Sequence, residues 1–151
     1  MQSILLVCLG NICRSPMAEA VLKAQLPGVK LVASAGTSAV GGPMDARAAA
    51  ALERRGHKPL KKFRSRPFET ADFERYDLIL AMDARNLAEL LKRQPEGSRA
   101  RVQLLLDYVP DLQGQDVPDP YYGPAAGFDR ALELIEKGVA GLGVSMGARP
   151  A

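Results

Sequence analysis

Short aliphatic runs alternate along the chain with longer segments of mixed polarity. Residues 3–9 form a continuous aliphatic run that ends at a Gly-Asn pair, which is typical of a strand buried on both faces. Runs of the same kind occupy residues 31–35, 78–82 and 102–106. The pattern therefore predicts four short strands.

The segments between these runs have helical signals. Ser15 is a good N-cap, with a proline in the first turn of the helix that follows, and this helix ends before Pro27. Further helices are expected at residues 45–56, 84–92 and 127–142. Strands that alternate with helices favour a parallel sheet with helices on both faces. We expect a single three-layer α/β/α domain over residues 1–151.

Composition narrows the class of protein. The 151 residues are 47% hydrophobic and 25% charged, which excludes a disordered chain. Residues 4–9 are the apolar run near the N-terminus, far short of the about 18 residues of a membrane span. That end also lacks the basic region and long apolar stretch of a secretion signal, so we expect a cytoplasmic protein with no membrane partner. Two cysteines and one histidine argue against a disulfide framework and against a structural metal site.

Positive charge is concentrated in residues 54–66, where seven lysines and arginines occur. A module that binds nucleic acid or an acidic partner is one interpretation of this run. Phe63 and Phe68 are the aromatic residues near it, and no recognised nucleic-acid motif is present. Because such a charge run is usually a solvated face, nucleic acid is not expected as the main partner.

The segment after the first strand carries the strongest chemical signal. Ligands of parallel sheets bind at the carboxyl ends of the strands, which here points to residues 8–15. Backbone amides and the helix dipole at such a place form a nest for a tetrahedral dianion. Gly10 permits close approach, Asn11 tolerates a left-handed conformation, and Arg14 is able to bind two anion oxygens with its fork.

Cys8 begins this loop, and its position favours nucleophilic chemistry. The amides, the dipole and Arg14 are expected to lower the thiol pKa into the ~3.5–7.5 range. A thiolate beneath a phosphoryl group is placed for in-line attack and a phosphocysteine intermediate, and the Ser15 hydroxyl is placed to donate to the sulfur. An isolated cysteine there is usually a core residue, but the Cys-x5-Arg-Ser spacing reverses that preference. A nucleotide site is weaker, because the Walker lysine and the further glycines of a dinucleotide fingerprint are missing.

A proline-rich segment, residues 110–124, predicts a long functional loop. Asp119-Pro120-Tyr121-Tyr122 within it offers a carboxylic acid beside two aromatic rings. Expulsion of a phenol from a phosphate ester needs a proton donor, and general acid catalysis supplies ~10²–10⁴ in rate. An Asp-Pro pair alone indicates only a turn, but together with the Cys8 loop it makes Asp119 the leading candidate.

Four segments resemble, in order and over nearly the whole chain, the low-molecular-weight protein tyrosine phosphatases: residues 7–16, 34–37, 80–83 and 119–123. The resemblance implies a four-stranded parallel sheet, Cys8 as nucleophile, Arg14 as phosphate clamp, Asp119 as general acid, and no metal or cofactor. The implied phosphate-binding loop consists of Leu9, Gly10, Asn11, Ile12, Cys13, Arg14 and Ser15.

The same resemblance implies supporting roles around the loop. Asn11 and Ser34 would hold the loop in shape, and Tyr121 and Tyr122 would form a wall for a substrate ring. Cys13 would pair with the nucleophile in a reversible disulfide under oxidation. The implied partners are phosphate and other oxyanion inhibitors and a phosphotyrosine protein, in bacteria often a tyrosine kinase of polysaccharide export.

Two departures from the family pattern concern substrate choice and loop support. The rim at residues 38–42 is shorter than in relatives and lacks their aromatic residue, with Val40 as the nearest bulky side chain. Small phosphorylated metabolites therefore stay open as an alternative substrate class. The histidine that often braces the loop corresponds to Lys61 or Lys62 here, and His57 is expected to be a solvated surface residue.

Two related functions on similar loops fit the sequence less well. Arsenate reductases need additional cysteines, and this chain has no third one. The phosphocysteine carriers of sugar transport lack an arginine at the place of Arg14 and lack the Asp-Pro acid. The sequence therefore favours a phosphomonoester hydrolase.

Overall fold

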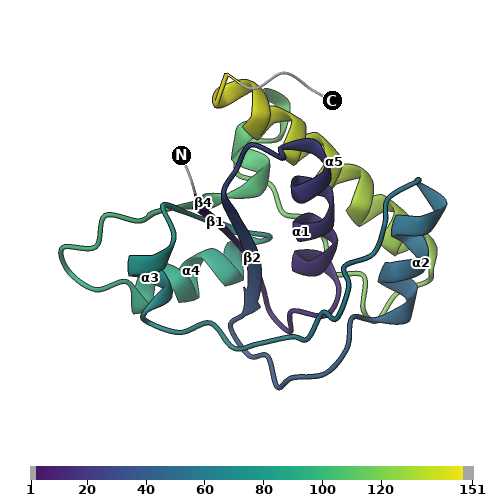
Figure 1. Ribbon diagram of the computed structural model, residues 1–151, viewed down its shortest axis with the longest axis horizontal. Coiled ribbons are helices and arrows are strands. Elements are labelled where there is room, and N and C mark those ends of the chain that lie inside the picture. The colour runs from purple at the N-terminus through teal and green to yellow at the C-terminus, as the bar shows by residue number, and fades with distance from the viewer. Residues whose placement is uncertain (1–2, 148–151) are drawn as a thin grey trace.

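One parallel sheet forms the centre of the computed structural model, which describes residues 3–147. Its strands are β1 (Ser3–Cys8), β2 (Leu31–Gly36), β3 (Leu78–Ala81) and β4 (Arg101–Leu104), in the order β2-β1-β3-β4 (Figure 1). Because β1 lies between β2 and β3, its carboxyl end at Cys8 is flanked by two other strand ends. This arrangement confirms the expected four-stranded parallel sheet.

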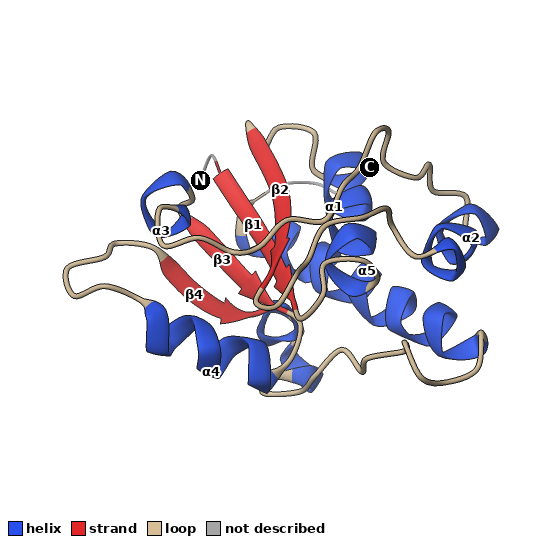
Figure 2. Ribbon diagram, turned by 90° about the horizontal axis from the view of Figure 1, so that it is seen from below, coloured by secondary structure: helices blue, strands red, loops and turns tan. Residues whose placement is uncertain are grey.

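Helices cover both faces of the sheet. They are α1 (Arg14–Gln25), α2 (Ala46–Arg54), α3 (Asp72–Arg75), α4 (Ala84–Arg93) and α5 (Ala126–Ser145). Figure 2 shows α1, α2 and α5 on one side of the sheet and α3 and α4 on the other. The expected three-layer α/β/α class is therefore confirmed as well.

The continuous aliphatic run of β1 follows from burial on both faces. Ile4 and Leu6 belong to the apolar core shared with α1 and α5. Leu5 and Val7 point to the opposite core, where they join Phe68 of the connection before α3. Successive side chains of a strand alternate between faces, so a strand with helices on both sides needs apolar residues at every position.

Some element boundaries differ from the sequence prediction. The fourth aliphatic run does not stay extended: after β4 it turns into a 3₁₀ helix, η1 (Leu105–Tyr108). Leu105 is fully buried and lies against α5, so its apolar character serves the packing of that helix. A second 3₁₀ turn, η2 (Pro110–Leu112), opens the proline-rich loop. Only four residues long, α3 was not predicted.

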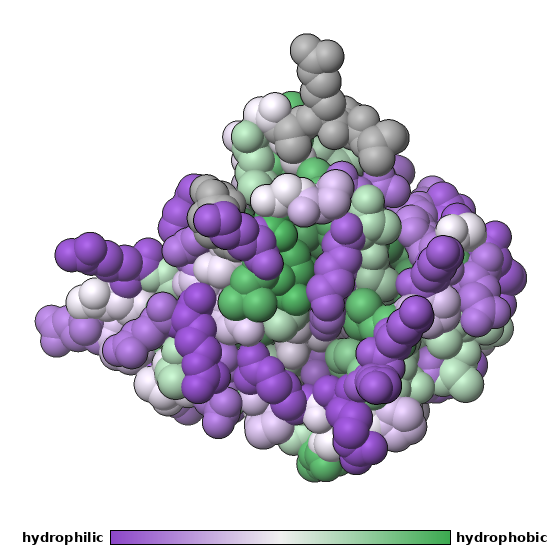
Figure 3. All heavy atoms as spheres, in the orientation of Figure 1, coloured by the Kyte–Doolittle hydropathy of each residue, from purple (hydrophilic) through white to green (hydrophobic). Residues whose placement is uncertain are grey.

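Long hydrophilic side chains cover much of the face shown in Figure 3, with apolar side chains visible between them. Within residues 3–147, none of the helices is both long and apolar enough to cross a membrane. The single domain predicted for residues 1–151 also includes residues 1, 2 and 148–151, which lie outside the described range.

Candidate active site

The loop of residues 9–13 joins β1 to α1 at the carboxyl edge of the sheet. The segment after β2 holds it there, because Thr37 N–H donates to the Cys8 carbonyl at 3.0 Å and Ser38 N–H to the Leu9 carbonyl at 2.8 Å. Gly36 permits this approach, since a Cβ there would lie 2.6 Å from the Leu9 oxygen. The backbone of this loop, the Cys8 loop, is therefore held in a fixed position.

Cys8 lines a cavity of about 190 Å³ at this edge. Its Sγ lies 3.0 Å from Ser15 Oγ and accepts a hydrogen bond from Asn11 N–H at 3.2 Å. The cavity is lined by Cys8, Leu9, Gly10, Ile12, Cys13, Arg14, Asp119, Tyr121 and Tyr122. The thiol, the arginine and the candidate acid therefore meet at one place.

Asn11 is the centre of a buried hydrogen-bond network. Its φ of 56° confirms the expected left-handed conformation. The side-chain Nδ2 donates to Ser15 Oγ at 2.7 Å and to Ser34 Oγ at 2.9 Å, while Oδ1 accepts from Arg66 N–H at 3.0 Å. Ser34 Oγ in turn donates to Glu19 Oε1 at 2.6 Å.

The direction of these bonds determines where the Ser15 proton goes. Arg66 N–H fixes the orientation of the Asn11 amide, because a backbone donor requires the oxygen. Both N–H groups of the Asn11 side-chain amide then donate, one to Ser34 and one to Ser15. The proton of Ser15 is consequently left for Cys8 Sγ, in the direction that stabilises a thiolate.

The expected N-cap role of Ser15 is wrong. Helix α1 begins at Arg14 with Cys13 as N-cap, and among the described residues no side chain caps this end. The Ser15 hydroxyl is unavailable because it serves Cys8 and Asn11. The first amides of α1 therefore stay open toward an anion.

Arg14 is buried and held in a fixed orientation. Its Nη1 donates to Asp83 Oδ2 at 2.6 Å and to the Val117 carbonyl at 3.0 Å, and its Nη2 lies 3.5 Å from Asp119 Oδ2. Asp83 is the N-cap of α4. Asp83 was not predicted as a site residue, although an acid two residues after β3, the strand beside β1, is the signal that could have located it.

Asp119 and the two tyrosines form the opposite side of the cavity. The Asp119 carboxylate is 43% exposed and accepts from Tyr121 N–H at 3.1 Å. The Tyr121 and Tyr122 rings meet edge to face, 4.9 Å apart. Val40 is almost fully exposed and does not line the cavity, so its part in substrate choice stays a prediction.

Residues 3–149 match the family described as low molecular weight phosphotyrosine protein phosphatase. The chain belongs to this family. The family resemblance and the enzyme class expected from the sequence, a cysteine-dependent protein-tyrosine phosphatase that needs no metal, are therefore confirmed.

Relatives of this phosphatase match over almost their full lengths. A putative low molecular weight protein-tyrosine-phosphatase of Synechocystis, slr0328, is 42% identical, over 95% of this chain and 96% of that protein. A protein tyrosine phosphatase from Entamoeba histolytica with Hepes in its active site has a TM-score of 0.88 at 36% identity and covers 97% of both chains. Vibrio vulnificus Wzb in complex with benzylphosphonate has a TM-score of 0.84 at 32% identity, over 95% of this chain and 98% of that chain.

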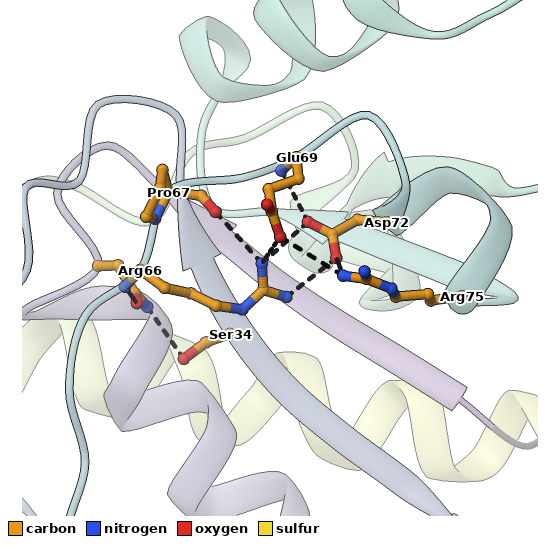
Figure 4. A network of polar contacts seen from close by, with 7 residues as sticks. Ser34, Arg66, Pro67, Glu69, Asp72 and Arg75 are labelled. Carbon is orange, nitrogen blue, oxygen red and sulfur yellow. Dashed lines mark hydrogen bonds and ion pairs between the residues drawn. The ribbon is translucent and has the colours of Figure 1, made fainter.

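Arg66, rather than Lys61 or Lys62, reaches the Cys8 loop of the phosphatase. Both lysines are exposed, whereas the Arg66 main chain binds Asn11. The Arg66 guanidinium makes two hydrogen bonds of 3.0 Å to Asp72, a fully buried carboxylate of α3 (Figure 4). Neither residue was predicted, because the contact depends on how the segment before α3 crosses the sheet edge.

The environment of His57 also differs from the expectation. Its side chain is 10% exposed and Nε2 lies 2.7 Å from Glu136 Oε2 of α5, so it is not a solvated residue. The basic run around it is partly neutralised as well. Arg54 pairs with Asp129, and Arg55 with Glu136. These ion pairs weaken the interpretation of residues 54–66 as an open nucleic-acid surface.

Cys13 lines the same cavity as Cys8. Burial, together with the negative charges of Asp45 and Cys8, raises the pKa of Cys13 to about 12. Cys13 is therefore a protonated thiol at neutral pH. The second cysteine of the loop is a poor nucleophile in the resting protein.

Proposed function

We propose that this phosphatase hydrolyses phosphotyrosine esters through a phosphocysteine on Cys8. The observation that carries the proposal is the convergence of three groups on one cavity. Cys8 Sγ, the Arg14 guanidinium and the Asp119 carboxylate all line it, next to the first amides of α1. These are a nucleophile, a clamp for a dianion and a proton donor.

Each step of the proposed reaction uses one of these groups. The thiolate attacks phosphorus in line, the S–P bond forms, and the P–O bond to the phenol breaks. Asp119 gives its proton to the leaving oxygen, and Arg14 with the loop amides stabilises the equatorial oxygens. Asp119 then takes a proton from the water that cleaves the S–P bond. Ser15 stabilises the departing thiolate through its hydrogen bond.

The tyrosine pair supports an aryl ester as substrate. Tyr121 and Tyr122 line the cavity, where a substrate ring would stack against them. The benzylphosphonate bound by the Vibrio vulnificus relative has an aryl group next to a tetrahedral anion, as phosphotyrosine does. We propose a cytoplasmic phosphotyrosine protein as the substrate, with a tyrosine kinase of polysaccharide export as the family-based expectation.

Phosphate release from a phosphotyrosine peptide and a matched phosphoserine peptide tests the substrate class. We would measure both in EDTA at mildly acidic to neutral pH, with Cys8→Ser as the control. Strong preference for the tyrosine ester, abolished by Cys8→Ser, is expected. Turnover by the serine variant would remove Cys8 as nucleophile. Failure on both peptides, with activity on small phosphorylated metabolites, would retain the chemistry and replace the substrate.

A further inference from the structure

Arg47 of α2 connects the phosphatase's acid loop, residues 118–123, to the rest of the fold. Its Nη1 donates to the Tyr121 carbonyl at 3.1 Å. Tyr121 is two residues from Asp119, and its N–H donates to the Asp119 carboxylate. Tyr121 is thus held at its carbonyl by Arg47 and bound to the candidate acid at its amide.

The guanidinium of Arg47 is itself fixed in place. Nε and Nη2 donate to the two carboxylate oxygens of Asp45, at 3.2 and 2.9 Å, which leaves Nη1 for the loop. These hydrogen bonds hold the pKa of Asp45 below its ordinary value, although partial burial opposes the shift. Asp45 N–H also donates to the Ile12 carbonyl at 2.8 Å. Arg47 therefore links the acid loop to the Cys8 loop through one intermediate residue, Asp45.

Two aromatic rings complete the contact. The Arg47 guanidinium carbon lies 4.6 Å from the ring centre of Phe128 and 5.3 Å from that of Tyr121. Phe128 is fully buried in the first turn of α5, so it provides a rigid support. Stacking on Arg47 holds the Tyr121 ring, a part of the cavity wall, at a set distance from α5.

We propose that Arg47 is a positioning residue of the dephosphorylation reaction, which acts through Tyr121 to hold Asp119 over the leaving oxygen. The proposal rests on the proposed function and deepens it. Arg47 does not line the cavity and acts through Tyr121. A lysine at this place would keep the charge but lose the forked guanidinium, so it would bind the Asp45 carboxylate or the Tyr121 carbonyl less well.

Esters with different leaving groups distinguish this positioning role from a purely structural one. A misplaced acid slows esters whose leaving oxygen needs a proton and hardly affects esters with a strongly acidic phenol. We would compare kcat/KM of Arg47→Met and Arg47→Lys for phenyl phosphate and 2,4-dinitrophenyl phosphate. For Arg47→Met we expect about a tenfold loss on the first ester, a part of the ~10²–10⁴ that general acid catalysis supplies, and little loss on the second. The kcat/KM of Arg47→Lys for phenyl phosphate should lie between those of Arg47→Met and the wild type.

Arg54→Met is the matched control. Arg54 is on the same helix and is similarly exposed, but its ion pair is with Asp129 of α5 and not with residues 118–123. Arg54→Met should leave the ratio of kcat/KM for the two esters unchanged. An equal loss on both esters in Arg47→Met, or no loss on either, would overturn the positioning role while the wild type stays active. A wild type that is inactive on both esters would instead overturn the proposed function.

Discussion

At the scale of single residues, Asp119 has the exposure and the neighbours of a group that gives and takes a proton. Its carboxylate is almost half exposed at the cavity, 3.5 Å from Arg14 Nη2. Asp119→Ala should therefore slow phenyl phosphate by ~10²–10⁴, and dinitrophenyl phosphate much less. A series of aryl phosphates of graded phenol acidity measures this as a steeper dependence on the leaving group. An equal loss for every ester would contradict the acid role.

A second prediction at the scale of single residues concerns the oxidation of Cys13. We predict that mild peroxide inactivates the enzyme by forming a Cys8–Cys13 disulfide, and that a thiol reductant then restores the activity. Cys13→Ser cannot form this disulfide, so it should recover less activity. Because the pKa of Cys13 is about 12, its thiolate is scarce at neutral pH and grows as the pH rises. Formation of the disulfide in the peroxide-treated wild type should therefore become faster as the pH rises above neutral, because more Cys13 thiolate is available to attack the oxidised Cys8. A Cys13→Ser variant that recovers equally well would remove the disulfide.

Local sequence was enough to propose the reacting groups, but not the groups that hold them. Cys8 and Arg14 lie in one contiguous segment, and Asp119 stands in a recognisable Asp-Pro-aromatic segment, so a local pattern indicates each of these candidates. Asp83, Arg66 and Arg47 come from three other parts of the chain. Their contacts depend on how those segments meet at the sheet edge, which no local pattern encodes.

At the scale of elements, α5 shows why one of its glycines is needed for packing. A Cβ on Gly141 would lie 2.2 Å from the Tyr108 carbonyl oxygen, which is backbone and cannot yield easily. Gly141→Ala should therefore lower the free energy of unfolding by about 1–3 kcal/mol. Urea unfolding measures the change.

Gly127→Ala in the same helix is the control for this prediction. Its Cβ would meet Pro120 at 3.5 Å, an ordinary contact, and alanine favours a helix over glycine. We expect a neutral or stabilising effect. Equal stability of the two variants would show that α5 is not restrained by η1 at Gly141.

The same close packing explains where the sequence failed to predict the elements. The run at residues 102–106 contains the residues of a buried strand, yet β4 ends at Leu104 because Leu105 packs against α5. A short apolar run does not by itself distinguish an extended segment from a 3₁₀ turn beneath a helix. The four strand positions were predictable because each run is bounded by turn residues or polar segments.

At the scale of the whole molecule, Glu136 ties α5 to the segment after α2. Burial alone would raise its pKa, but the hydrogen bonds from Arg55 and His57 outweigh burial, so the pKa lies below its ordinary value. A carboxyl with a lowered pKa in the folded state stabilises the fold above its unfolded pKa. That contribution is lost as the pH falls through the folded value.

Glu136→Gln tests this tie. The variant should be less stable than the wild type by about 0.5–1 kcal/mol at neutral pH, where the carboxylate is charged. The difference should shrink as the solution is made more acidic than the ordinary glutamate pKa. Denaturant unfolding at several pH values measures it. A difference that stays constant with pH would mean that the charge of Glu136 does not contribute.

Because the start of α1 has no side-chain cap among the described residues, binding of the substrate anion should also affect the stability of the folded protein. Cys13 is the N-cap of this helix. We expect a phosphate bound in the loop to accept hydrogen bonds from the amides that a side-chain cap would otherwise satisfy. A ligand that binds only the folded chain stabilises it by about 2.7 kcal/mol at a hundredfold excess over its Kd. Inorganic phosphate, the product of the proposed reaction, should therefore raise the melting temperature, and by occupying the same loop it should slow turnover. Inhibition and heat resistance should then follow a single binding curve.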